Sequence, residues 1–137
     1  MMEKQSELYR SITKGSKVGI VETNDCVVRS FSLAANRPYD EVHALCKLHG
    51  RKDRKGTYQE TTERVALALG FRTVVERKYR RATKYGTLAQ FLRDNPKGRY
   101  FLIRNGHAFA VIDGVVHDWE RGTGPRSRVV YAAKLGS

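Results

Sequence analysis

Two glycine-containing dipeptides, Asn105-Gly106 and Asp113-Gly114, separate short segments rich in β-branched and aromatic residues. Such dipeptides favour tight hairpin turns, because both of their residues can adopt positive φ angles. We therefore expect an antiparallel meander in the C-terminal part of the chain, built from residues 100–104, 107–112, 115–119 and 129–133. This pattern constrains the fold more strongly than any other feature of the sequence.

The chain before this region has mainly helical periodicity. Asn24 and Asp25 are good caps for a helix over residues 25–35, and Thr87 caps another that runs to Asn95. Two further helices and one strand are expected: a helix from Pro38 to Gly50, a helix that begins at Thr61 or Thr62 and covers residues 63–69, and a strand over residues 71–76. Helices followed by sheet predict one α+β domain at residues 16–137, with a flexible N-terminus at residues 1–15.

The net charge of +12 is the most unusual property of the composition. A field this basic favours anionic partners such as nucleic acid or an acidic protein. Two basic segments are candidate anion-binding sites, although both could instead be solvated loops. Their residues are Arg51, Lys52, Arg54 and Lys55 in the first and Arg77, Lys78, Arg80, Arg81 and Lys84 in the second, where Tyr79 and Tyr85 are interleaved.

Several classes of protein are disfavoured. The chain has no apolar run near the ~20 residues that cross a bilayer, and its polar N-terminus does not resemble a secretory signal, so an intracellular site of synthesis is expected. Both cysteines are predicted to be free thiols, with Cys46 in the core. His43, Cys46 and His49 lie on one predicted helix but drift around it without a fourth ligand, so neither a metal nor another cofactor is expected.

Three residues have the chemistry of a nucleophilic site. Cys26 opens a predicted helix, where free amides and the positive end of the helix dipole favour a thiolate. Pairing across the Asp113-Gly114 turn places Phe109 opposite Asp118, which leaves His107 on the diagonal from Asp118. An acid in that position would orient the imidazole that takes the thiol proton, as in a Cys-His-Asp triad, whereas His117 faces the other way.

The sequences Asn24-Asp25-Cys26 and GHAFAVIDGVVHDW (residues 106–119) resemble the papain-like cysteine peptidase superfamily, most closely its bacteriocin-processing (double-glycine leader) peptidase branch. The NDCVVR sequence at residues 24–29 also resembles small bacteriophage proteins. The resemblance covers roughly residues 18 to 120. It implies a papain-like fold, with the nucleophile Cys26 at a helix start and the helices packed on a C-terminal antiparallel sheet. It also implies that His107 is the general base and acid and that Asp118 orients it.

The sequence departs from that branch at two positions. Ile20 stands six residues before the cysteine, where the branch has an oxyanion-binding glutamine, and Val27 replaces a usual glycine. Asn24 and Gln59 are the candidate replacements for the glutamine, together with the backbone amide of Cys26. Because the loss of one oxyanion donor slows such enzymes by on the order of 100- to 1000-fold, the departure at Ile20 argues against fast proteolysis.

Two functions are consistent with these features. The first is a cofactor-independent cysteine peptidase or amidase that acts on a peptide or protein through a thioester, in the cytoplasm or, if the chain is encoded by a phage, in the host cytoplasm or the virion. The second is a catalytically inactive papain-like scaffold whose basic loops bind nucleic acid or an acidic protein.

Overall fold

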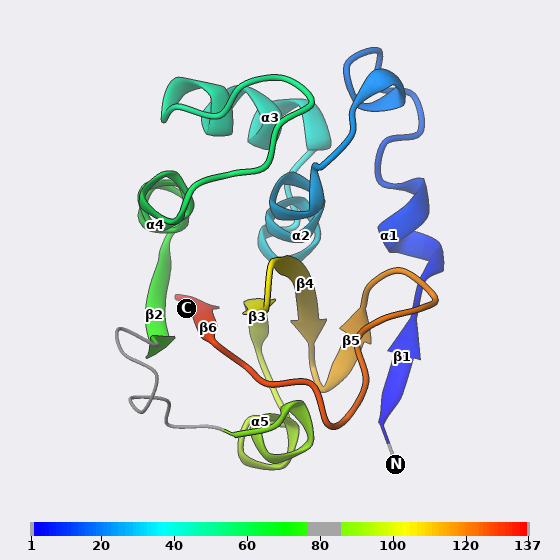
Figure 1. Cartoon of the computed structure of the whole chain (residues 1–137), viewed down its shortest axis with the longest axis vertical. Helices are drawn as coiled ribbons and strands as arrows, with labels where there is room; N and C mark the ends of the chain where they lie inside the picture. The colour runs from blue at the N-terminus through cyan, green and yellow to red at the C-terminus, as the bar shows by residue number, and fades with distance from the viewer. Residues whose placement is uncertain (1, 77–85, 137) are drawn as a thin grey trace.

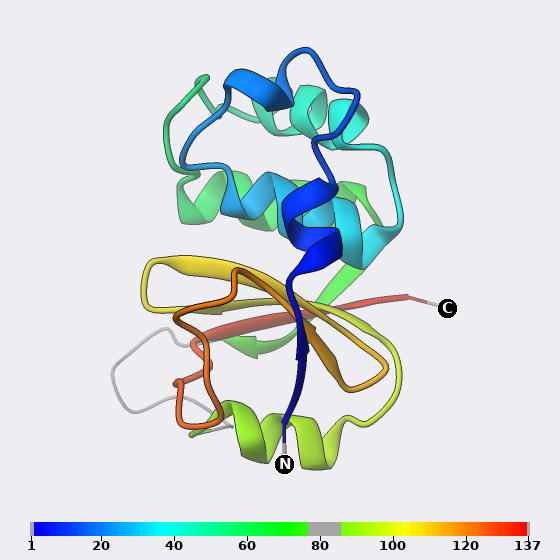
Figure 2. The ribbon, with the colours of Figure 1, turned by 90° about the vertical axis from the view of Figure 1, so that its right-hand side faces the viewer.

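The computed structural model describes residues 2–76 and 86–136, which form one mixed β-sheet with helices on both of its faces (Figures 1 and 2). The order of the six strands across the sheet is β1-β5-β4-β3-β6-β2. The strands are β1 (Glu3–Gln5), β2 (Phe71–Glu76), β3 (Arg99–Arg104), β4 (His107–Ile112), β5 (Val115–His117) and β6 (Tyr131–Leu135). The α-helices are α1 (Glu7–Ser11), α2 (Cys26–Ala35), α3 (Tyr39–Leu48), α4 (Gln59–Ala68) and α5 (Leu88–Asp94), and a short 3-10 helix spans Gly19–Val21.

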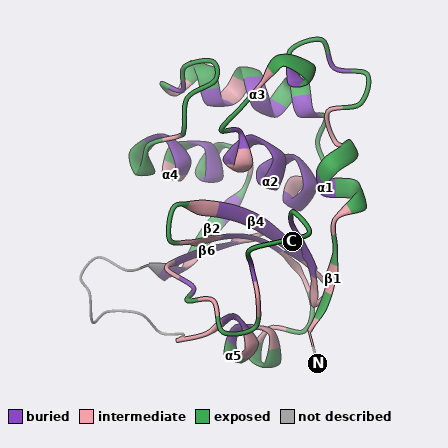
Figure 3. Cartoon of the chain, turned by 45° about the vertical axis from the view of Figure 1, so that its right-hand side comes forward, coloured by how far each residue is buried: buried purple, intermediate pink, exposed green. Residues whose placement is uncertain are grey.

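The helices are divided unequally between the two faces of the sheet. Figure 2 shows α1 to α4 above the sheet and α5 alone below it. Helix α2 lies at the centre and packs against both β3 and β4, while α3 covers its outer side. The residues of α2 are almost all buried, as Figure 3 shows, because this helix is enclosed by the sheet and by the other helices.

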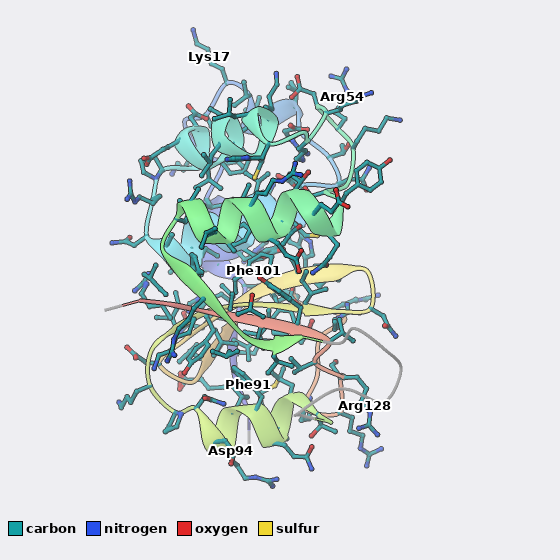
Figure 4. The ribbon with its side chains drawn as sticks, turned by 90° about the vertical axis from the view of Figure 1, so that its left-hand side faces the viewer. Lys17, Arg54, Phe91, Asp94, Phe101 and Arg128 are labelled. Atoms are coloured by element: carbon teal, nitrogen blue, oxygen red, sulfur yellow. The ribbon has the colours of Figure 1, made fainter. Side chains whose placement is uncertain are left out.

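Alternation along β4 builds a separate core on each face. Ala108 and Ala110 belong to the core under α2, whereas Phe109 and Val111 belong to the core above α5. The small alanines allow α2 to approach β4 closely, and this brings the start of the helix next to the start of the strand. In Figure 4, Phe101 lies between the helical layer and the sheet, and Phe91 lies between α5 and the sheet.

The predicted hairpins are present. Asp113 and Gly114 have φ angles of 49° and 81°, the left-handed pair that a tight type I′ turn requires. The register places Ile112 opposite Val115 and Ala110 opposite His117, which is the same register that was predicted to set Phe109 opposite Asp118. Thr87 also caps α5 as predicted, through a reciprocal capping box with Gln90.

The α+β class is therefore correct, and the C-terminal strands β3, β4, β5 and β6 pair antiparallel as expected, but this pairing does not describe the whole sheet. Strand β1 runs parallel to β5, so the sheet is mixed. The last strand does not continue the meander, because β6 inserts between β3 and β2 and pairs antiparallel with both. It begins at Tyr131 rather than residue 129, β5 ends at His117 rather than residue 119, and α4 begins at Gln59 rather than near Thr61.

The N-terminal residues form two elements where the sequence indicated a flexible segment. Strand β1 extends the sheet beside β5, and the Tyr9 side chain of α1 is fully buried. Strand β1, with three residues, and helix α1, with five, are too short to show periodicity in the sequence. Their formation therefore depends on contacts with distant parts of the chain. None of the helices within residues 2–76 and 86–136 has both the length and the apolar character needed to cross a membrane.

Candidate active site

Cys26 is the first residue of α2, at the point where the chain turns sharply into the helix. Asn24 makes the turn with a φ angle of 53°, a conformation that asparagine tolerates better than most residues. Asp25 occupies the N-cap position, but its carboxylate does not cap the helix. It accepts hydrogen bonds from Tyr39 Oη at 2.8 Å and Arg29 Nε at 3.2 Å. The first-turn amides around Cys26 are thus not used by the cap side chain.

His107 and Asp118 are joined directly. The distance from Nε2 of His107 to Oδ1 of Asp118 is 2.5 Å, and the Asp118 side chain is completely buried. The same Oδ1 accepts the backbone N–H of Trp119 at 2.7 Å, while Oδ2 has no hydrogen-bond partner among the described residues. The structure therefore brings together the histidine and the aspartate that the predicted hairpin register placed on a diagonal.

Cys26 lies beside the start of β4, the strand that carries His107. Its sulfur accepts the backbone N–H of Ala108 at 3.4 Å, which ties the start of α2 to the start of β4. Burial lowers the pKa of His107, but hydrogen bonds with Asp118 and Cys26 outweigh this effect and raise the pKa to about 9. Because Asp118 occupies Nε2, Nδ1 is the ring nitrogen available to the thiol. The structure thus brings a cysteine next to a hydrogen-bonded His-Asp pair, and we refer to these three residues as the Cys-His-Asp cluster.

Residues near the N-terminus contact the backbone on either side of this cluster. The Tyr9 hydroxyl donates a 2.9 Å hydrogen bond to the carbonyl of Ala108, and its ring lies edge-on to Trp119. The carbonyl of Gln5 accepts the backbone N–H of Asp118 at 3.1 Å. Arg29 donates to the carbonyl of Tyr9 at 2.8 Å and lies over the Trp119 ring. Both Asp118 and the start of β4 are thus held by residues far away in the sequence.

A cleft of about 800 Å³ opens beside the cluster. Cys26 and His107 lie in its wall, so the sulfur and the imidazole can both reach a bound molecule. The remainder of the wall combines polar groups with apolar ones, and Glu63 is its acidic residue. The other lining residues are Val27, Gly56, Thr57, Gln59, Thr62, Ile103, Asn105, Gly106, Ala108, Val130 and Tyr131.

The two candidate oxyanion donors occupy different places. Gln59 begins α4 and lines the cleft with Cys26. The side-chain amide of Asn24 instead donates to the carbonyl of Arg54 at 3.1 Å, and Asn24 is not among the lining residues. Of these two side chains, Gln59 is the one placed to reach a molecule bound at Cys26.

The first basic segment contains one residue that cannot bind an external anion. Arg51 is buried, and its guanidinium donates to Oε2 of Glu22 at 2.8 Å, so its assignment to an anion-binding surface is wrong. Lys52, Arg54 and Lys55 are exposed. The candidates of the second segment, Arg77, Lys78, Arg80, Arg81 and Lys84, lie outside the described residues.

His43 also belongs to a buried ion cluster rather than to a group with Cys46 and His49. Its Nε2 lies 2.5 Å from Oε2 of Glu22 and 3.5 Å from Oδ1 of Asp53. Burial would raise the pKa of Glu22, but hydrogen bonds from Arg51, His43 and the Arg54 amide lower it to about 2. The side chains of Glu22, His43 and Asp53 could each offer one ligand atom to a metal ion, and these atoms lie within 4.8 Å of one another. The Arg51 guanidinium, however, already neutralises Glu22.

Cys26 and Cys46 are both free, as predicted. Cys46 is completely buried in the core, where loss of hydration raises the pKa of its thiol to about 12 despite the nearby charge of Arg51. Cys26 is only partly buried and lines the cleft. The two thiols therefore differ strongly in their access to solvent.

The roles of Tyr9 and Arg29, which contact residues around the site, and of Glu22, which holds the other cluster together, were not predicted from the sequence. Arg29 lies four residues after Asp25, the spacing at which side chains meet on a helix, so that pair had a local signal. Tyr9 and Glu22 had none, since their partners lie 99 and 21 residues away.

The fold and the site together define an α+β chain in which Cys26 and His107 line a cleft and the buried Asp118 lies behind His107. Comparison with protein-family models, with curated proteins and with solved structures finds no match to this chain.

Proposed function

We propose that this chain is a papain-like cysteine hydrolase that cleaves a peptide or other amide bond through a thioester on Cys26. One observation carries the proposal: Asp118 is hydrogen-bonded to His107, and His107 and Cys26 lie together in the wall of a cleft that can hold a substrate. Together they provide a nucleophile, a proton carrier and an orienting acid, which are the parts needed for acyl transfer.

In the proposed reaction each step is assigned to one of these residues. Transfer of the thiol proton to His107 leaves a thiolate, which attacks the substrate carbonyl carbon. His107 then donates that proton to the departing nitrogen as the carbon–nitrogen bond breaks and the thioester forms. A water molecule, deprotonated by His107, attacks the thioester carbonyl and releases the carboxylic acid product, and the proton returns to the thiol. Asp118 orients the ring throughout and stabilises its positive charge.

The state of His107 favours this chemistry. Because Asp118 and Cys26 outweigh burial and raise its pKa to about 9, the ring keeps the proton that it takes from the thiol at neutral pH. A cationic ring beside the sulfur stabilises negative charge there and is also the acid that the leaving group requires.

The cleft also provides candidate donors for the oxyanion of the tetrahedral intermediate. The backbone amide of Cys26 lies at the start of α2, where the Asp25 side chain makes no capping hydrogen bond. The side-chain amide of Gln59 is the second candidate, and it would take the place of the glutamine that Ile20 replaces. We expect Gln59→Ala to slow turnover by about 100-fold or more if it is such a donor.

A direct test is to trap the thioester. The protein is mixed with acetylglycine p-nitrophenyl ester, quenched in acid and examined by intact and peptide mass spectrometry. We expect an acetylglycyl group on Cys26 in the wild type, none in Cys26→Ser and a much smaller amount in His107→Ala. His43→Gln is the matched control, because it removes a histidine of the other buried cluster. Acylation of the wild type that is unaffected in His107→Ala would contradict the proposal.

A further inference from the structure

A second hollow of about 530 Å³ adjoins the cleft that contains Cys26. Gly56 and Thr57 line both spaces and form the wall between them. The other residues of the hollow are Gly50, Lys52, Lys55 and Tyr58. A chain bound at Cys26 could therefore continue past Gly56 and Thr57 into this hollow.

The charges of the two spaces differ. Lys52 and Lys55 line the hollow, none of its lining residues is acidic, and neither lysine forms an ion pair within residues 2–76 and 86–136. The cleft itself contains Glu63, which would repel an acidic group bound there. An acidic side chain is thus favoured in the hollow and disfavoured beside Glu63.

Two further features of the hollow suit a polar ligand. Tyr58 is 81% exposed, an unusually open position for an aromatic ring, which leaves its face available to a bound chain. The Thr57 hydroxyl lies in the shared wall, is shielded from solvent and has no hydrogen-bond partner among the described residues. Helix α4 begins at Gln59, next to this wall, and Tyr58 makes no side-chain cap, so the positive end of the helix dipole also favours an anion here.

We propose that this hollow is a specificity subsite that binds an acidic side chain of the peptide substrate while the scissile bond lies at Cys26. The proposal builds on the function proposed above and narrows the substrate to peptides with a glutamate or aspartate near the cleaved bond. Lys52 and Lys55 supply the charge, and Tyr58 supplies a surface on which the peptide packs.

The first experiment compares alkylation of Cys26 by three pairs of peptide chloromethyl ketones. Each pair is an acetylated Ala-Ala-Ala probe with Glu or Gln at one of the three positions. In at least one pair we expect the Glu probe to react about fivefold faster, the size expected of two exposed charge pairs. The preference should disappear in Lys52→Glu/Lys55→Glu. It should persist in Arg93→Glu/Lys97→Glu, which changes the net charge equally but at exposed positions in and after α5.

A second experiment does not require a reactive cysteine. Fluorescein-labelled acetyl-Glu-Ala-Glu-Ala and its Gln counterpart are titrated with the Cys26→Ala protein and followed by fluorescence anisotropy. We expect tighter binding of the Glu peptide, lost in the lysine double variant and kept in the α5 double variant. If the chloromethyl ketones fail to react while this pattern holds, the subsite stands and the hydrolase function fails.

Other results would overturn the subsite. Equal reactivity and equal binding of the Glu and Gln peptides would show that the hollow does not recognise an acid. An equal loss of the preference for Glu over Gln in both double variants would show that only the net charge of the protein matters. Tighter binding of a fluorescein-labelled single-stranded oligonucleotide, abolished by the same two lysine substitutions, would assign the hollow to nucleic acid instead.

Discussion

Among the described residues, two histidine–carboxylate pairs have the same 2.5 Å separation but different surroundings. His43 and Glu22 share their cluster with Arg51, whose guanidinium neutralises the carboxylate inside the helical layer. His107 and Asp118 have Cys26 as their third member, and two of these residues, Cys26 and His107, line the cleft. Local geometry alone therefore does not distinguish a structural ion cluster from a candidate catalytic one; the third group and access to a cleft do.

The two clusters also differ in the pH at which they stabilise the fold. The pKa of Glu22 is lowered to about 2, so its contribution is present above about pH 4.5 and is lost as the pH falls through 2. The pKa of His107 is raised to about 9, so its contribution is present below about pH 6.5 and is lost as the pH rises through 9. One cluster weakens in acid and the other in alkali.

The largest effect is expected from breaking the structural cluster. Glu22→Gln leaves the buried charge of Arg51 without its partner, which should lower the free energy of unfolding at pH 7 by about 3–5 kcal/mol. Urea denaturation followed by circular dichroism measures this change. The double variant Glu22→Gln/Arg51→Met removes both charges and should recover part of the loss, which keeps the test informative if the single variant does not fold. A loss below about 1 kcal/mol in the single variant would show that the cluster is not structural.

The next effect is the alkaline loss of the second cluster. The difference in free energy of unfolding between the wild type and His107→Gln should fall by on the order of 3 kcal/mol from pH 6.5 to pH 9, because the proton is bound more tightly in the folded state. Urea denaturation across this range gives the difference. His43→Gln, taken through the same series, serves as the control. A difference that stays constant with pH would mean that Asp118 and Cys26 do not hold a proton on His107.

A smaller effect should follow from removing one support of the candidate site. Tyr9→Phe deletes the hydroxyl that donates to the Ala108 carbonyl, so we expect a loss of about 1–2 kcal/mol in stability. We also expect slower alkylation of Cys26, since Ala108 donates its N–H to the sulfur. Tyr100→Phe is the matched control on the α5 face of the sheet, where the lost hydrogen bond goes to Asn95. Equal rates of Cys26 alkylation in the two variants would show that the Tyr9 hydroxyl does not support the candidate site.

Much of the fold could be predicted from local signals. The Asp113-Gly114 turn set the register that brings His107 to Asp118, and Thr87 marked the start of α5. The place of β1 could not be predicted in this way. Its parallel pairing with β5 joins residues more than 110 positions apart, and three residues are too few to show alternation.

The candidate site, like the fold, was predictable where local signals mark a residue and not where distant contacts decide its place. Cys26 could be located because a helix start gives a recognisable sequence signal, and Asp118 because a hairpin has a fixed register. The role of Arg51 could not be foreseen, since a basic loop residue has the same sequence signature whether it faces solvent or folds inward onto Glu22. The lining of the cleft was equally hidden, because it combines the starts of two helices with the β3–β4 turn.

The most direct test of the central claim is the pH dependence of iodoacetamide alkylation at Cys26, measured by peptide mass spectrometry in the wild type and in His107→Ala. Cys46 is the internal reference, because burial raises the pKa of its thiol to about 12. We predict that Cys26 of the wild type reacts rapidly even at pH 6, a pH far below the pKa of ~8.5 of an ordinary thiol. We also predict that His107→Ala loses this reactivity. If Cys26 reacts only above pH 8 in both proteins, or is as unreactive as Cys46, the proposed hydrolase site is contradicted.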